Sequence, residues 1–205
     1  GGEGGAGDNG ASGDGGDGGI GVAFFGTGNT FINSGRVFGG NGGAGGDAAG
    51  TELDGVAGLG GAGVVGSDLT IINSGWISGG SSANAVTFGA GANVFEHRAG
   101  GRVTGNVVGD GDDLFRLGGD TDGTFDLALI GSTYRGFGSF EKTGNSTFTL
   151  GGTTTQLTPW TISDGVLEIL SAGALGAETG LLTFNNPDTA LEFTAVLRTY
   201  DNLNT

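Results

Sequence analysis

FINSGRVFGG at residues 31–40 recurs as IINSGWISGG at residues 71–80, and this repeat decides the fold. In both copies a short apolar run meets an Asn-Ser-Gly corner, and a second short run follows the corner. Asn and Gly accept the positive φ that a sharp corner requires, so the corner is suited to turning the chain between two strands. We interpret the offset of 40 residues as two turns of about 20 residues each.

Short runs rich in β-branched and aromatic residues continue along the chain, which predicts many short strands joined by turns. Several of these runs recur about 20 residues apart, at 125–129, 148–150, 166–169 and 191–193. One such turn has too few inward side chains to bury a core alone, so neighbouring turns must stack. A β-sandwich would need longer strands joined by two-residue Asn-Gly or Asp-Gly hairpins. We therefore predict an all-β fold, a right-handed parallel β-helix (solenoid) with Gly-rich loop insertions.

Alternation within the clearest runs predicts which side chains point inward. Phe125, Leu127 and Leu129 fall on one face of a single extended strand, and Phe148 and Leu150 fall on one face of another. These residues are the expected core of the C-terminal half.

Composition excludes several classes of protein. The chain has 205 residues, of which 51 are glycine and none is cysteine, and its formal net charge is -15 at pH 7. This charge repels a phosphate backbone, so we expect no nucleic-acid partner. Without cysteine there is no disulfide scaffold and no Cys-ligated zinc or iron–sulfur site. Along the whole chain the glycines follow no strict three-residue period, which excludes collagen.

Glycine is concentrated in two stretches, which divide the chain. Residues 1–19 are almost all Gly, Asp, Ala and Ser, and we predict a flexible segment or loop there. Residues 20–135 are expected to form stacked turns, with a second Gly-rich insertion at 39–63 that projects as a loop. Residues 136–205 are expected to form further turns. The chain starts without Met or a signal sequence, so we expect a mature fragment of a longer protein.

The C-terminal part is similar to a known sequence repeat. Residues 140–153 and 160–169 resemble the autotransporter-associated β-strand repeat, which has a KTG-type strand pair followed by a T-x-I-x-x-G-x-L-x-L strand pair. The matching positions are Lys142, Thr143, Gly144, Thr147, Leu150 and Gly152 in the first motif and Thr161, Ile162, Gly165, Val166 and Ile169 in the second. Asn145 and Ser146 replace the usual residues of the first motif.

The resemblance implies the passenger domain of a type V secretion autotransporter from a Gram-negative bacterium. It implies a cell-surface or secreted adhesin or virulence factor, exported across the outer membrane by a C-terminal β-barrel that belongs to the full-length protein. The implied partner is a host-surface protein or glycan, or another copy in self-association between cells. The resemblance also implies that the turns of 136–205 act as a folding nucleus during secretion.

Acidic, glycine-rich turns raise a calcium hypothesis. GDGDDLF at residues 109–115 resembles one nonapeptide of the RTX calcium-binding β-roll, and GGDTDGTF at residues 118–125 is an imperfect second copy. The candidate ligands are Asp110, Asp112, Asp113, Asp120 and Asp122. Solvent-exposed acidic turns are the interpretation that we adopt, and a calcium-stabilised RTX-like β-roll stays open as an alternative.

The sequence gives little support for a catalytic function. His97 is the only histidine, so any Ser-His-Asp triad must use it, and we interpret it as an exposed turn residue. We therefore predict no enzyme and no cofactor apart from the calcium hypothesis. A β-helical carbohydrate-active enzyme that uses paired carboxylates remains the second alternative. Trp76, Trp160 and Tyr134 suit a sugar- or ice-binding ladder, but we interpret them as stacked core aromatics.

Overall fold

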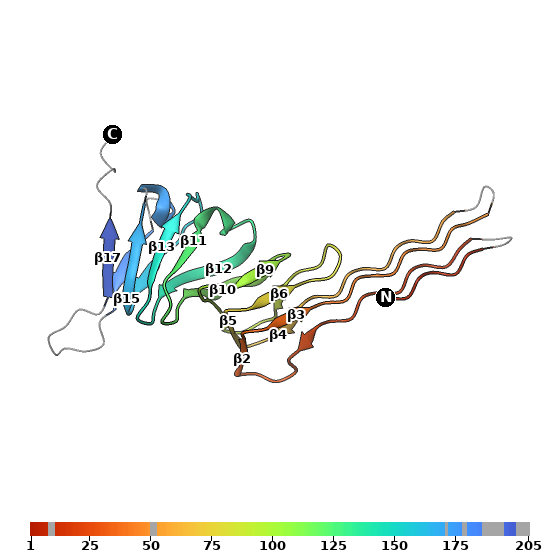
Figure 1. Ribbon diagram of the computed structural model, residues 1–205, viewed down its shortest axis with the longest axis horizontal. Coiled ribbons are helices and arrows are strands. Elements are labelled where there is room, and N and C mark those ends of the chain that lie inside the picture. The colour runs from red at the N-terminus through yellow and green to blue at the C-terminus, as the bar shows by residue number, and fades with distance from the viewer. Residues whose placement is uncertain (8–10, 50–52, 171, 178–179, 186–194, 200–205) are drawn as a thin grey trace.

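The computed structural model describes residues 1–7, 11–49, 53–170, 172–177, 180–185 and 195–199. The fold is all-β: short strands stack along one axis, and a long glycine-rich projection leaves the N-terminal end (Figure 1). Every ladder between the described strands is parallel, from the first pair to the last. The prediction of an all-β fold built from parallel strands is confirmed.

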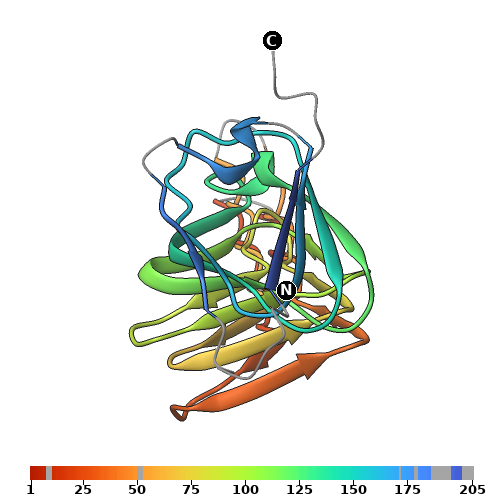
Figure 2. The same cartoon turned by 90° about the vertical axis from the view of Figure 1, so that its left-hand side faces the viewer.

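The described strands form three sheets, which Figure 2 shows around a common interior. The largest sheet contains β1 (Val22–Ala23), β2 (Asn29–Asn33), β4 (Val64–Gly66), β5 (Leu69–Asn73), β7 (Val86–Phe88), β8 (Val94–His97), β10 (Val107–Leu117), β12 (Tyr134–Lys142), β14 (Trp160–Ile162) and β16 (Leu182–Phe184). The second contains β3 (Arg36–Phe38), β6 (Trp76–Ser78) and β9 (Arg102–Thr104). The third contains β11 (Gly123–Asp126), β13 (Thr147–Gly151), β15 (Gly165–Ile169) and β17 (Ala195–Thr199). Two short 3-10 helices, η1 (Leu127–Leu129) and η2 (Ala172–Leu175), complete the elements.

Strand register confirms the Asn-Ser-Gly repeat and corrects its spacing. Phe31 pairs with Ile71 and Asn33 pairs with Asn73, so the two copies are direct neighbours in the sheet. The Asn33 side-chain amide donates a hydrogen bond of 2.8 Å to the side-chain oxygen of Asn73, which joins the two corners. The offset is therefore one step of the stack and not two turns, because residues 39–63 leave the stack and return.

Aromatic and aliphatic side chains form the core by stacking in register. One column runs through the largest sheet and contains Phe31, Ile71, Phe95, Phe115, Phe140, Trp160 and Leu182. Ring centroids along it lie 6.3 Å apart for Phe95 and Phe115, 6.1 Å for Phe115 and Phe140, and 5.4 Å for Phe140 and Trp160. Burial of these rings supplies a large part of the hydrophobic stabilisation.

The predicted inward faces are confirmed in one strand and partly wrong in another. Phe148 and Leu150 in β13 are both buried. After Phe125 the strand ends at Asp126, and the following residues form η1, in which Leu127 is buried but Leu129 is 37% exposed. The Asp126 carboxylate caps η1 by accepting the N–H two residues along at 3.0 Å. This local cap replaces the extended backbone that alternation predicts.

A fully buried lysine holds the turn of the KTG motif. The Lys142 ammonium donates to the carbonyl oxygens of Thr143 and Gly144, both at 2.8 Å, and of Asp164 at 3.3 Å. Burial lowers the pKa of Lys142 to about 8, although the nearby carboxylates, that of Asp164 first, act in the opposite direction. The three carbonyls satisfy all three donors, which explains how a lysine can stand in a core position.

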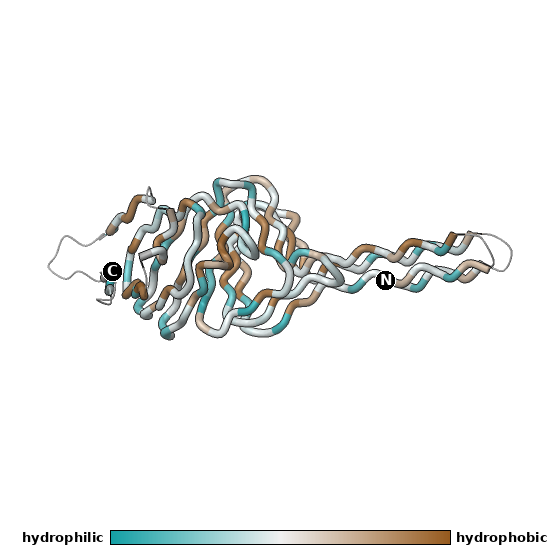
Figure 3. The backbone as a smooth tube through the Cα atoms, turned by 90° about the horizontal axis from the view of Figure 1, so that it is seen from above, coloured by the Kyte–Doolittle hydropathy of each residue, from teal (hydrophilic) through white to brown (hydrophobic). Residues whose placement is uncertain are grey.

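The glycine-rich stretches project together as four extended segments, which we call the glycine bundle: residues 1–7, 11–21, 39–49 and 53–63 (Figures 1 and 3). Its backbone hydrogen bonds recur at every third residue, with Gly40, Gly43 and Gly46 donating to Gly19, Gly16 and Gly13, and Gly55, Gly58 and Gly61 donating to Gly46, Gly43 and Gly40, over 2.7–3.0 Å. A three-residue repeat is the period of polyproline-II-type chains. The two stretches that the sequence separates are thus one hydrogen-bonded unit.

Polar side chains add to the bonds of the glycine bundle. The carboxylates of Asp14 and Asp17 accept the backbone N–H groups of Val56 and Leu59, both at 2.7 Å. The side chains of Val56 and Leu59 themselves point outward and are exposed, as is that of Leu53. The bundle therefore presents a row of exposed apolar side chains at three-residue spacing, and Figure 3 colours hydrophobic positions at intervals along the projection.

Candidate functional site

The first group of predicted calcium ligands lies in an irregular part of β10. Asp113 is fully buried, and its carboxylate accepts the backbone N–H and the side-chain amide of Asn93, both at 3.0 Å. It also accepts the N–H of Asp110 at 3.2 Å. Burial raises the pKa of the Asp113 carboxyl, and the hydrogen bonds from Asn93 oppose that change. Asp113 thus acts as a structural acceptor, while Asp112 beside it is exposed.

The other two predicted ligands tie neighbouring turns together. The Asp122 carboxylate accepts the backbone N–H of Thr147 at 2.7 Å, and the Asp120 carboxylate accepts the side-chain amide of Asn145 at 3.4 Å. Across the described part of the chain, no group of three or more His, Cys, Asp or Glu side chains is placed to hold a metal ion. Calcium binding therefore stays a prediction, without a gathered set of carboxylates to carry it.

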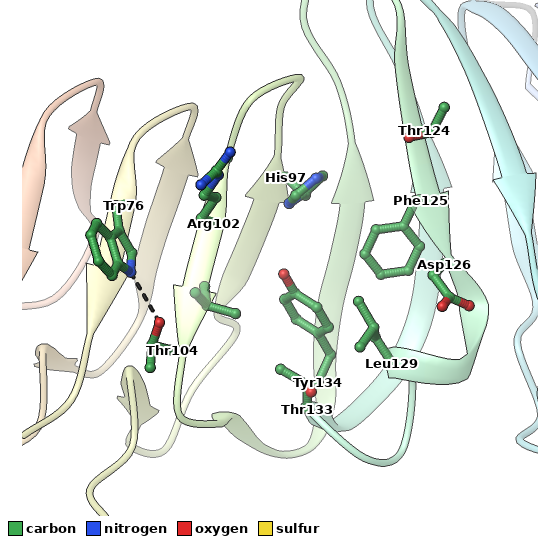
Figure 4. A pocket seen from close by; sticks show the side chains of 12 residues that line it. Trp76, His97, Arg102, Thr104, Thr124, Phe125, Asp126, Leu129, Thr133 and Tyr134 are labelled. Carbon is green, nitrogen blue, oxygen red and sulfur yellow. Dashed lines mark hydrogen bonds between the residues drawn. The ribbon is translucent and has the colours of Figure 1, made fainter. Parts of the chain in front are cut away.

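A pocket lies where two of the sheets end. β9 is the last strand of its sheet and β11 is the first strand of another, and no ladder joins these two described strands. Between them opens a cavity of about 450 Å³ (Figure 4). Its principal side chains are Trp76, His97, Arg102, Thr104, Phe125 and Tyr134. They come from β6, β8, β9, β11 and β12, so the pocket exists only in the stacked chain.

His97 lies inside this pocket and not in an exposed turn, which corrects the sequence interpretation. It is 8% exposed at the end of β8, where its register partners are Asn73 and Leu117. Its ring contacts those of Phe125 and Phe148, with centroids 5.4 and 6.3 Å away. Burial lowers the pKa of His97 to about 4, so the imidazole is neutral at pH 7. Its Nδ1 atom has no hydrogen-bond partner.

Tyr134 supplies a second buried polar group. It pairs with Val107, in a column of otherwise aliphatic residues that begins at Val22 and runs through Val64 and Val86. Burial raises the pKa of the phenol above its ordinary value, so the hydroxyl stays protonated. Figure 4 shows this hydroxyl directed into the space between His97 and Arg102. A tyrosine in an aliphatic column is the signal in the sequence that could have indicated the pocket.

Trp76 forms the rim of the pocket and is only half-buried. Arg36 and Arg102 are its register partners, and the Arg36 guanidinium lies 5.6 Å from the centre of its ring. The indole N–H donates to the Thr104 hydroxyl at 3.1 Å. The prediction of a core aromatic is confirmed for Trp160 and Tyr134, which are buried, and is wrong for Trp76.

Acid should lower the unfolding free energy of the native chain more than it lowers that of a His97→Gln variant. The pKa of His97 is about 4 when folded and about 6.5 when unfolded, so the unfolded state binds more protons between these values. The free energy of unfolding therefore falls as pH falls from about 6.5 to about 4, by a total on the order of 3 kcal/mol. Urea unfolding of both proteins at pH 7 and near pH 4.5 measures the difference. Equal losses in the two proteins would contradict this assignment, because the carboxylates titrate in both.

The described residues contain no helix that is long and apolar enough to cross a membrane. Comparisons of the chain with protein-family models, with curated proteins and with solved structures found no match.

Proposed function

We propose that the chain is part of an autotransporter passenger, a right-handed parallel β-helix that is secreted or displayed on the surface of a Gram-negative bacterium. It acts there as a non-catalytic adhesin, a rod that carries binding surfaces toward a host protein or glycan or toward another cell. The sequence repeat at residues 140–169 suggests the passenger, and the arrangement of the strands supports a rod.

The observation that carries the proposal is one column of register pairs that runs through the largest sheet. The column from Ile71 through Phe95, Phe115 and Phe140 to Trp160 advances by one parallel strand at each step. Parallel strands need a crossover, and here the crossover consists of short strands of the other sheets instead of a helix. A stack of this kind can be extended at either end without changing its cross-section, which suits a long surface rod.

Surface charge supports the same proposal. Glu96, Arg116 and Glu141 follow one another in register, Glu96 being buried, with Arg116 Nη1 3.6 Å from a Glu96 oxygen and Arg116 Nε 2.7 Å from a Glu141 oxygen. The chain as a whole carries a net charge of -15 at pH 7. Like charges on separate rods oppose edge-to-edge pairing and keep them apart in solution.

Adherence of coated beads tests the adhesin proposal. Fluorescent beads carrying the 205-residue chain are applied to cultured epithelial cells and to immobilised matrix proteins, with albumin-coated beads as the control. We expect several-fold more chain-coated beads to be retained, or the chain-coated beads to clump if the rods bind each other. Retention and clumping equal to the albumin control would overturn the proposal. A separate melt with and without EDTA tests the calcium-stabilised alternative, which requires the melting temperature to fall with the chelator.

A further inference from the structure

We propose that the pocket between β9 and β11 binds one acidic sugar unit, a pyranose ring that bears a carboxylate. The inference rests on the proposed function, since it names the chemistry of a glycan partner. Three features of the pocket support it: its size and aromatic walls, its unpartnered polar groups, and its arginines.

The size and walls of the pocket fit one sugar ring. Its volume is about 450 Å³, within the range of about 300–1,000 Å³ that small-ligand sites occupy. Trp76 at the rim is half-buried and offers an apolar face, and the buried rings of Phe125 and Tyr134, with centroids 5.5 Å apart, line the pocket behind it. Sugar rings present C–H groups on their faces and hydroxyls on their edges, so they need both aromatic and polar walls.

Two polar side chains of the pocket, those of His97 and Tyr134, make no hydrogen bond within the described residues. The Nδ1 atom of His97 is buried without a hydrogen bond, and leaving such an atom unsatisfied costs about 1–3 kcal/mol. The low pKa of His97 keeps its imidazole neutral at pH 7, so one ring nitrogen can donate a hydrogen bond and the other can accept one. The Tyr134 hydroxyl faces the same space (Figure 4). A ligand hydroxyl in this space can hydrogen-bond the Tyr134 hydroxyl.

The charge at the pocket favours an anion. Arg102 lines it, and among the described residues this guanidinium forms no salt bridge. Arg36, on the other strand next to that of Trp76, holds its guanidinium 5.6 Å from the centre of the indole ring. The carboxylate of Asp126 already caps η1, and Figure 4 shows it directed away from His97 and Tyr134. In a chain with 7 basic against 22 acidic residues, two arginines lie beside this one tryptophan, on the strands that flank it. Arginine is well suited to a carboxylate.

Titration of the purified chain with methyl β-D-glucuronide and methyl β-D-glucoside tests the inference by NMR. We expect saturable shifts of the pocket resonances by the glucuronide, with Kd in the range of about 0.1–5 mM, and at least about fivefold weaker binding of the glucoside. Absence of saturable shifts with either sugar at about 20 mM would overturn the inference. Equal affinity for the two sugars would overturn the acidic specificity.

Three variants assign the binding to the pocket. Arg102→Gln and Tyr134→Phe should each weaken glucuronide binding at least about fivefold. Arg135→Gln, which alters an exposed arginine outside the pocket, should leave it unchanged. Arg102 is exposed, so Arg102→Gln should fold normally and still test the pocket if the Tyr134→Phe variant is unstable. Native affinity in Arg102→Gln would overturn the assignment. Sugar binding without bead adherence would overturn the adhesin proposal alone, and adherence without sugar binding would overturn the pocket alone.

Discussion

Phe115→Ala should lower the free energy of unfolding by about 3–5 kcal/mol, the usual cost of truncating a buried phenylalanine. Phe115 is fully buried at the centre of the aromatic core. Its ring centroid lies 5.0 Å from those of Phe125 and Tyr134 and 5.8 Å from that of Phe137. Neighbouring strands hold these rings in register, so the stack cannot close around the cavity, and a large part of the stability is lost.

Urea unfolding followed by circular dichroism measures this effect, and Phe25→Ala is the matched control. Phe25 is 99% exposed, so removing its ring should change the unfolding free energy by less than about 0.5 kcal/mol. If both variants lose the same stability, or if Phe115→Ala loses less than about 1 kcal/mol, the register that places Phe115 at the centre of the core is wrong.

Gly43→Ala should disrupt the glycine bundle without melting the stacked strands. A β-carbon at Gly43 would overlap the carbonyl oxygen of Gly2 on the neighbouring segment, and backbone on both sides leaves no flexible side chain to move aside. The bond from the Gly43 N–H to the Gly16 carbonyl, at 2.8 Å, would be lost with the close approach. We expect amide exchange within the bundle to accelerate at least about tenfold.

Gly19→Ala is the control for this substitution, because a β-carbon at Gly19 meets nothing within 4 Å. Hydrogen exchange read by mass spectrometry compares the two variants, with peptides from β12 to β15 as an internal reference that should stay protected in both. Equal protection of the bundle in Gly43→Ala and Gly19→Ala would show that the segments are not packed against each other as described.

Several structural details were readable from residues close together in the sequence. The Asn-Ser-Gly corners were predicted as turns, and Asn33 and Asn73 do lie at matching corners. Phe148 and Leu150 were predicted inward from their alternation and are buried. The inward faces were predictable because alternation depends on local strand geometry. The corners turn without the positive φ that was expected at Asn and Gly, and glycine at position 75 is required instead because a β-carbon there would meet the Gly35 backbone.

Other predictions were wrong because a distant residue or a competing local hydrogen bond determines the conformation at that position. His97 has polar neighbours in the sequence but is buried, since the register places it inward beside Asn73 and Leu117. Leu129 alternates correctly for a strand, yet the Asp126 cap begins a 3-10 turn before that residue. Neither outcome can be read from hydrophobic pattern alone.

The glycine bundle shows the same limit on a larger scale. GGNGGAGGD at residues 39–47 carries a three-residue glycine pattern, but a count over the whole chain hides it. The reason for the pattern is the packing of residues 1–7 and 11–21 alongside residues 39–47. Glycine is required there because a β-carbon would overlap the neighbouring backbone.

The amino-acid order alone predicted the strands and the corners, because these depend on periods of two residues and on a few corner residues. It also predicted parallel stacking, because short strand-and-corner units recur along the chain. The tertiary structure decided which repeats are neighbours, how two separated glycine stretches become one bundle, and that His97, Phe125 and Tyr134 face one pocket. Those outcomes depend on contacts between residues many positions apart, whose register is selected by the packing of the whole core.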